Sequence, residues 1–191
     1  MPGTSCKEAI KKWEEKTGQN AAEAKEVALY CQIPFIERMD EALNTLENCE
    51  KLSLSTNDIE RIGPLPKLKN LKILSLARNK IRRITSLDEI GNSLEQLWLS
   101  YNLIEKLEGL QPCIKLEVLF MSNNKIKSWD EVGKLAQLSK LTKLLLFGNT
   151  CYQERSKDEM APYVIKRVPG VSELDGKSVT AAVRKAAEEL D

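Results

Sequence analysis

Residues 94–104 read LEQLWLSYNLI and contain the spacing Leu97-x-Leu99-x-x-Asn102-x-Ile104. The same spacing, with one methionine in place of a leucine, recurs in residues 52–59, 74–81 and 119–126. A shorter copy, Leu144-x-Leu146-x-x-Asn149, follows them. Self-similarity at a fixed period is the signature of a repeat architecture, so the period of this spacing decides the fold.

The asparagine of each copy measures the period. The five asparagines are Asn57, Asn79, Asn102, Asn124 and Asn149. Successive members are 22, 23, 22 and 25 residues apart, so the fifth turn carries a short insertion. This period and spacing are typical of leucine-rich repeats. We predict an α/β solenoid of leucine-rich repeats, with a parallel β-sheet on one face, short helical or 3₁₀ returns on the other, and helical caps at both ends.

The paired leucines and the asparagine have different tasks in each repeat. Strand side chains alternate between faces, so Leu97 and Leu99 point the same way into the core. The asparagine amide can bond backbone groups of adjacent turns that would otherwise be buried without a partner. We call Asn57, Asn79, Asn102, Asn124 and Asn149 the asparagine ladder.

The two ends of the stack need caps, because an open solenoid exposes its first and last turns. Ser5-x-x-Glu8 predicts the start of a helix that ends at Gly18, with Trp13 packed on the first turn. Residues 27–36 are interpreted as a degenerate repeat that contains Val27, Leu29, Ile33 and Ile36.

The C-terminal region predicts two more helices. Residues 160–168 form one, with Pro162 in its first turn. From Ser178 onward, a second helix places Val179, Val183, Ala186 and Leu190 on one side and Arg184 on the other. It is either a partner-binding tail or a helix folded back onto the solenoid. We predict one domain over 1–191: an N-terminal helical cap (1–26), about five to six repeats (27–150), a C-terminal cap (151–176) and a C-terminal helix (177–191).

The composition argues against most classes of enzyme. The chain has no histidine, which removes the commonest general base and metal ligand, and it has no glycine-rich phosphate loop. The five cysteines lack metal-site spacing and are interpreted as small apolar residues. The net charge of +1 does not suggest nucleic-acid binding. We expect a soluble intracellular protein, monomeric in isolation, without catalysis, cofactor or metal, and without a membrane partner.

The residue between the two core positions of each strand should face outward on the sheet. These residues are Ser53, Ser75, Trp98, Phe120 and Leu145. Adjacent strands lie about 4.8 Å apart, so the last three should form a contiguous apolar stripe that Phe147 extends. Aromatic residues also suit sheets for structural reasons, so mutual shielding is the alternative. Aromatic side chains dominate interface energies, which favours a partner-binding surface at Trp98, Phe120, Leu145 and Phe147.

Two groups of basic residues also stand out. One is Arg78, Lys80, Arg82 and Arg83 at a strand exit; the other is Lys166, Arg167, Lys177, Arg184 and Lys185 near the C-terminus. Most such groups are solvated surface. If either is functional, an acidic protein surface and a nucleic acid are both possible targets, and binding would weaken with salt.

Several short segments of the sequence resemble the light chain 1 family of axonemal outer-arm dynein, which belongs to the leucine-rich-repeat proteins with the 22-residue spacing. These segments are LSLSTN at 52–57, LEQLWLSYN at 94–102, MSNN at 121–124, KRVP at 166–169, and the N-terminal segments 9–16 and 33–40. The resemblance runs from about residue 7 to Gly176, and the tail beyond Gly176 departs from it most.

The resemblance implies a non-catalytic light chain in the axoneme of a cilium or flagellum. It implies binding of the sheet face to a dynein heavy chain, in the motor region near its microtubule-binding stalk, with tubulin as a further expected partner. Trp98, Phe120, Leu145 and Phe147 would then form the heavy-chain face, and Lys177 and Arg184 would form a weaker C-terminal contact. The alternatives are a scaffold or regulatory subunit of a protein phosphatase and an RNA-associated repeat protein of the spliceosome type.

Overall fold

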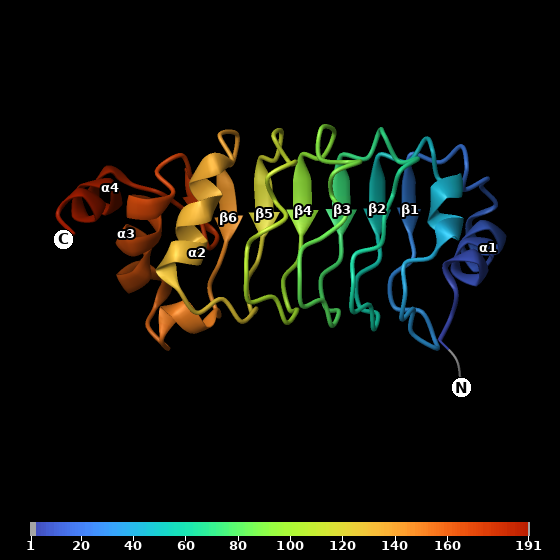
Figure 1. Cartoon of the computed structure of the whole chain (residues 1–191), viewed down its shortest axis with the longest axis horizontal. Coiled ribbons are helices and arrows are strands. Elements are labelled where there is room, and N and C mark those ends of the chain that lie inside the picture. The colour runs from blue at the N-terminus through green and yellow to red at the C-terminus, as the bar shows by residue number, and fades with distance from the viewer. Residues whose placement is uncertain (1–2, 191) are drawn as a thin grey trace.

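The strands of the protein lie side by side in chain order, as Figure 1 shows. The computed structural model describes residues 3–190. Strands β1 to β7 pair in parallel, and β8 pairs antiparallel with β7. The strands are β1 Glu26–Ala28, β2 Lys51–Ser53, β3 Ile73–Ser75, β4 Gln96–Trp98, β5 Val118–Phe120, β6 Lys143–Leu145, β7 Glu173–Leu174 and β8 Lys177–Ser178. The predicted leucine-rich-repeat solenoid is confirmed.

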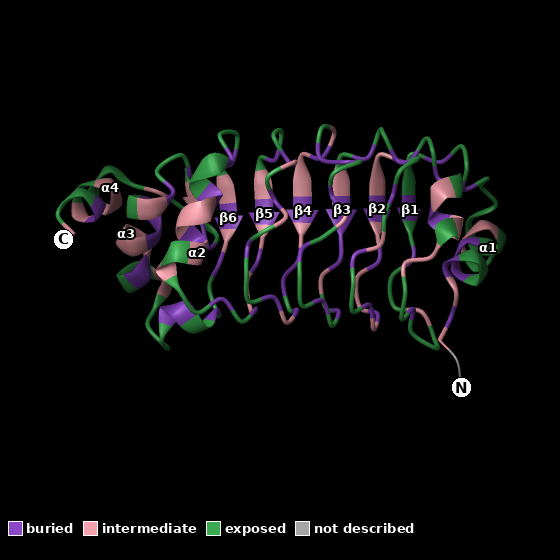
Figure 2. Cartoon of the chain, in the orientation of Figure 1, coloured by how far each residue is buried: buried purple, intermediate pink, exposed green. Residues whose placement is uncertain are grey.

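The core lies between the sheet and the returns, and its sheet side is a row of aligned apolar side chains. The register pairs equivalent positions of successive repeats, and the paired residues Leu52, Leu74, Leu97, Leu119 and Leu144 are all fully buried. Figure 2 shows the consequence in β2, β4, β5 and β6, where one buried residue lies between two half-buried ones. Each repeat buries its apolar side chains against the neighbouring repeats, so the stability of the solenoid depends on the stacking of successive repeats.

The returns opposite the sheet differ from the prediction. Helical structure occurs in the first return, as η1 Glu41–Thr45, and in the fifth, as α2 Trp129–Gly133 and η2 Lys134–Gln137. The three returns between β2 and β5, which are fully described, contain turns and bends but no helix. The prediction of helical returns was therefore wrong for them. The first and fifth returns each separate paired core residues by 25 positions, against 22 or 23 in the three returns without a helix, so their extra length accommodates helical structure.

The N-terminal cap agrees with the sequence. Helix α1 spans Cys6–Thr17, begins with a complete capping box between Ser5 and Glu8, and ends at Gly18 with a φ of 69°. Trp13 packs against the core. In the degenerate first repeat Val27, Leu29 and Ile36 are buried, but Ile33 is 81% exposed, so its assignment to the core was wrong. Ile33 lies in an irregular loop beyond β1, where strand alternation no longer decides which side chains face the core.

The asparagine ladder forms as predicted. The Asn102 carboxamide oxygen accepts a hydrogen bond from the Ile81 amide at 2.9 Å. Its nitrogen donates to the carbonyls of Leu76 and Leu99, both at 3.0 Å. The other four asparagines repeat this pattern and are buried as well. Each amide therefore joins two turns through backbone groups that have no strand partner.

The stack ends on a residue that the sequence had not marked as part of the ladder. Asp175 follows β7, is buried, and accepts hydrogen bonds from the amides of Leu146 and Phe147 at 2.7 and 2.9 Å. It also accepts one from the Tyr152 hydroxyl at 2.5 Å, in the short helix η3 Thr150–Tyr152. A carboxylate only accepts hydrogen bonds, so Asp175 binds the amides of the preceding turn but makes none of the donations to carbonyls that the asparagines make.

Of the two C-terminal helices, α3 begins earlier than predicted and α4 begins later. Helix α3 spans Lys157–Arg167 and starts from a capping box at Ser156 and Glu159. Pro162 therefore lies inside the helix and not in its first turn, and the prediction missed the capping residue upstream. Helix α4 spans only Ala181–Glu188, because Lys177 and Ser178 form β8 and Thr180 is the N-cap.

Helix α4 folds back onto α3, which resolves the alternative left open by the sequence. Ala187 is its buried residue and Ala186 is only half-buried. Arg184 does not lie on the outer side: its guanidinium donates to the carbonyls of Pro169 and Val171 at 2.8 and 2.9 Å. The prediction for Arg184 was wrong, because two carbonyls that follow α3 bind its guanidinium. Val179 and Val183, from the predicted apolar side, do pack against the core.

Candidate binding surface on the sheet face

The outward residues of the strands form rows across the sheet. The middle row consists of Ala28, Ser53, Ser75, Trp98, Phe120 and Leu145, which the register pairs one after another. The backbone hydrogen bonds continue past the strands, for example from Asn123 to Phe147, so the next outward row includes Ser55, Ala77, Ser100, Ser122 and Phe147. The four predicted site residues therefore lie on three adjacent repeats. We call Trp98, Phe120, Leu145 and Phe147 the apolar stripe.

The rings of the stripe contact one another and the C-terminal cap. Trp98 and Phe120 stack, with centroids 5.6 Å apart and planes inclined by 25°. Phe147 packs edge-to-face on Tyr152 at 5.7 Å, and the Lys157 ammonium lies 5.2 Å from the Phe147 ring centre. Such contacts fix the ring orientations, which lowers the entropy that a partner would have to remove.

The stripe remains accessible in spite of these contacts. Trp98, Phe120 and Leu145 are half-buried and Phe147 is 38% exposed. In Figure 1 the helices lie at the two ends of the solenoid, and none crosses strands β2 to β5. Mutual shielding therefore covers part of each ring, and the rest of the stripe faces solvent.

One polar atom of the stripe lacks a partner. The Trp98 indole nitrogen is out of contact with solvent and donates no hydrogen bond to any described residue. A buried donor without an acceptor typically costs about 1–3 kcal/mol. No hydrogen bond within residues 3–190 offsets this cost.

The charged residues of the inner row lie at its two ends. The inner row begins with an ion pair between Glu26 and Lys51 at 3.0 Å and ends with one between Lys143 and Glu173 at 2.8 Å. Between them the row holds Ile73, Gln96 and Val118. The three central residues of this row carry no ionisable group, so this part of the face suits contact with an apolar surface.

Tyr152 supports the stripe from behind and was not identified from the sequence. It is 1% exposed, and burial, together with the neighbouring Asp175 carboxylate, raises the pKa of its hydroxyl far above the ordinary value. Trp129 lies next to Tyr152 and Tyr163, at 6.4 and 6.0 Å between centroids. The only sequence signal was the position of Tyr152 in the segment after Asn149, where the repeat spacing stops.

The predicted C-terminal site residues are already engaged within the chain. Lys177 forms an ion pair with Asp158 at 2.7 Å, and Arg184 holds the two carbonyls described above. Both residues position the C-terminal segment beside α3. A direct contact of either with a partner stays a prediction.

Four of the five cysteines are buried, as their interpretation as small apolar residues predicts, and Cys31 is not. Burial raises the pKa of the Cys6, Cys49 and Cys151 thiols to about 11 and that of Cys113 to about 12, while Cys31 is exposed. Within residues 3–190, no group of three or more histidine, cysteine, aspartate or glutamate side chains could hold a metal ion. No helix in that range is long and apolar enough to cross a bilayer.

Comparison with known proteins places the chain in a family. A family model described as leucine-rich repeat matches residues 8–119. Dynein axonemal light chain 1 of Homo sapiens is 52% identical over 177 residues, which cover 92% of this chain and 93% of the relative. The chain belongs to the dynein axonemal light chain 1 family. The Chlamydomonas reinhardtii member is 46% identical over 188 residues, which cover 96% of this chain and 95% of that one.

Solved structures agree on the fold of this family member. A leucine-rich-repeat protein of Leptospira interrogans has a TM-score of 0.65 and 25% identity, covering 81% of this chain and 37% of that protein. A chain of the Drosophila melanogaster SNF/U2A′ complex has a TM-score of 0.55 and 21% identity, covering 86% and 79%. The second likeness shows the fold alone.

Proposed function

We propose that this protein is a non-catalytic light chain of axonemal outer-arm dynein that binds a dynein heavy chain through the apolar stripe. The observation that carries the proposal is the uncovered row of Trp98, Phe120 and Leu145 on adjacent strands, with Phe147 beside it. Relatives about half identical over nearly the whole chain are axonemal dynein light chains. That likeness supports the heavy chain as the partner and the axoneme of a cilium or flagellum as the location.

The stripe has the composition of an interface centre. Binding energy at interfaces is concentrated in a few aromatic anchors surrounded by groups that exclude water. The stacked Trp98 and Phe120 rings are such anchors, and the ion pairs at the two ends of the inner row form a polar rim. A partner with apolar side chains would bury the rings without having to desolvate an unpaired charge.

The light chain would act on the motor by binding alone. A bound subunit shifts a conformational equilibrium only by as much as its affinity differs between the two states. We therefore propose that the solenoid binds one state of the heavy-chain motor region more tightly than another. Contact with tubulin, which the resemblance also implies, has no feature of the sheet face to support it and stays a prediction.

Capture from ciliary extract, analysed by mass spectrometry, tests the proposal. Wild-type protein should capture a dynein heavy chain, and the double variant Trp98→Ala/Phe120→Ala should lose it. The matched control Ser53→Ala/Ser75→Ala changes the same row on two other strands and should retain it. Retention by the double variant would refute the site, and a phosphatase captured in place of heavy chain would refute the partner.

A further inference from the structure

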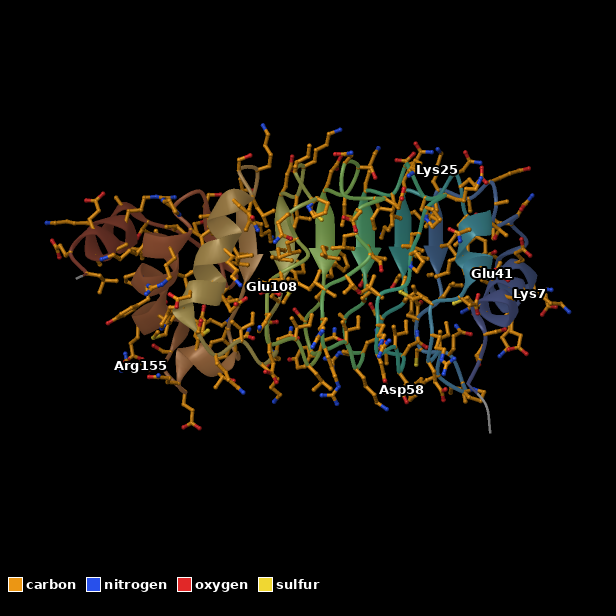
Figure 3. All side chains as sticks on the ribbon, in the orientation of Figure 1. Lys7, Lys25, Glu41, Asp58, Glu108 and Arg155 are labelled. Carbon is orange, nitrogen blue, oxygen red and sulfur yellow. The ribbon has the colours of Figure 1, made fainter. Side chains whose placement is uncertain are left out.

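A hollow of about 510 Å³ lies between the returns that follow β3 and β4, on the part of the surface marked by Glu108 in Figure 3. Three cationic side chains line it: Arg82, Arg83 and Lys106. Ile84 and Leu103 contribute apolar surface to the same hollow. None of these residues belongs to the apolar stripe.

The three cations of the hollow differ from several neighbouring lysines. Lys72 pairs with Glu50 at 2.7 Å and Lys80 with Asp58 at 2.8 Å, each across to a neighbouring turn. Among the described residues, no carboxylate forms an ion pair with Arg82, Arg83 or Lys106. This local excess is hidden in the overall charge of +1.

The carboxylates of the hollow do not cancel the excess. Glu105 pairs with Lys127 at 3.8 Å, and Glu108 pairs with Lys134 at 3.3 Å, both from the next turn. Lys134 also pairs with Glu131 at 2.6 Å, so it is shared between two carboxylates. The lining therefore holds three positive charges against two negative ones, and this positive excess lies beside the apolar surface of Ile84 and Leu103.

We propose that this hollow binds an acidic peptide segment. Guanidinium groups bind carboxylates through two parallel hydrogen bonds, and two adjacent arginines can hold neighbouring carboxylates of one chain. Ile84 and Leu103 offer contact to an apolar side chain between them. A nucleic acid fits less well, because single-stranded binding sites use aromatic platforms and no aromatic residue lines the hollow.

Fluorescence anisotropy with a fluorescein-labelled decaglutamate peptide tests the proposal. The test variant is Arg82→Gln/Arg83→Gln/Lys106→Gln, which keeps a polar hydrogen-bonding side chain at each position and removes three charges. The control Lys7→Gln/Lys12→Gln/Lys16→Gln removes three charges from exposed positions of α1. We expect salt-sensitive binding that weakens about tenfold in the test variant, from three exposed ion pairs, and less than twofold in the control.

Three results would overturn the proposal. They are no binding of decaglutamate by the wild type at low salt, equal loss in the two variants, and tighter binding of a single-stranded oligonucleotide of the same charge. The assay contains no heavy chain, so its outcome does not depend on the function proposed for the apolar stripe.

Discussion

The two halves of the sheet face share one inner wall and differ on the outside. In β2 and β3 the outward middle residues are Ser53 and Ser75; in β4 and β5 they are Trp98 and Phe120. The leucines behind them are buried to the same extent in all four strands. The buried core is therefore alike in the two halves, so the stability of the fold does not explain why aromatic residues lie on the outer side of only one half. We attribute that difference to binding.

A substitution on the inner wall should have the largest effect and should not distinguish the halves. Leu97→Ala and Leu74→Ala each remove a fully buried side chain, so each should lower the free energy of unfolding by about 2–5 kcal/mol. Urea unfolding followed by circular dichroism measures both. A loss confined to Leu97 would mean that the inner wall itself differs between the halves.

A carboxylate placed in the outward middle row should weaken partner binding in the aromatic half of the sheet face and have little effect in the serine half. Leu145→Asp puts an unpaired charge into the proposed interface, whereas Ser53→Asp puts one on the serine half. We expect the affinity for a heavy-chain motor fragment to fall at least about 30-fold for Leu145→Asp, since loss of an interface anchor costs about 2 kcal/mol or more. Calorimetric titration should show less than about threefold change for Ser53→Asp, and equal losses would contradict the comparison.

Substitutions in the asparagine ladder test whether the two halves contribute equally to the free energy of unfolding. Asn102→Ala leaves the Ile81 amide without its partner and removes one of the two asparagine donors from each of the Leu76 and Leu99 carbonyls, so the free energy of unfolding should fall by about 1–3 kcal/mol. Asn79→Ala in the serine half should cost the same. Thermal melts check both, with the exposed Asn70→Ala as control; an unchanged melt for Asn102→Ala would contradict the role of the ladder.

The buried thiols predict a smaller effect, at alkaline pH. Burial raises the pKa of Cys113 from 9.0 to about 12, so the folded state holds this proton more tightly than the unfolded chain. Its contribution to stability is complete below pH 9 and is lost as the pH rises from 9 toward 12. The urea midpoint should fall less between pH 8 and pH 10.5 in Cys113→Val than in the wild type. An identical fall in both would show that this thiol does not contribute.

The sequence predicted the periodic part of the molecule well. The spacing Leu-x-Leu-x-x-Asn fixes which strand residues face inward, and the residues between them must then face outward. The spacing alone therefore identifies Trp98, Phe120 and Leu145 as neighbours. The asparagine ladder followed from the same spacing, because a buried backbone group needs a partner.

The predictions failed where the period stops. Arg184 was placed on the outer side of its helix, since periodicity alone cannot show that two carbonyls at the end of the α3 segment bind it. Asp175 was not recognised as the end of the ladder, because it is not an asparagine and lies in a shortened turn. One prediction also failed inside the periodic part: the returns between β2 and β5 contain no helix, because their spacing of 22 or 23 residues leaves less chain than the 25 of the first and fifth returns.

Hydroxyl-radical footprinting of the chain, alone and bound to a heavy-chain motor fragment, tests the central claim most directly. The account predicts that binding protects Trp98, Phe120 and Phe147 from oxidation and leaves Tyr30, which is 55% exposed at the other end of the sheet, unprotected. Protection of Tyr30 or of residues in α4, with unchanged oxidation of the apolar stripe, would contradict it.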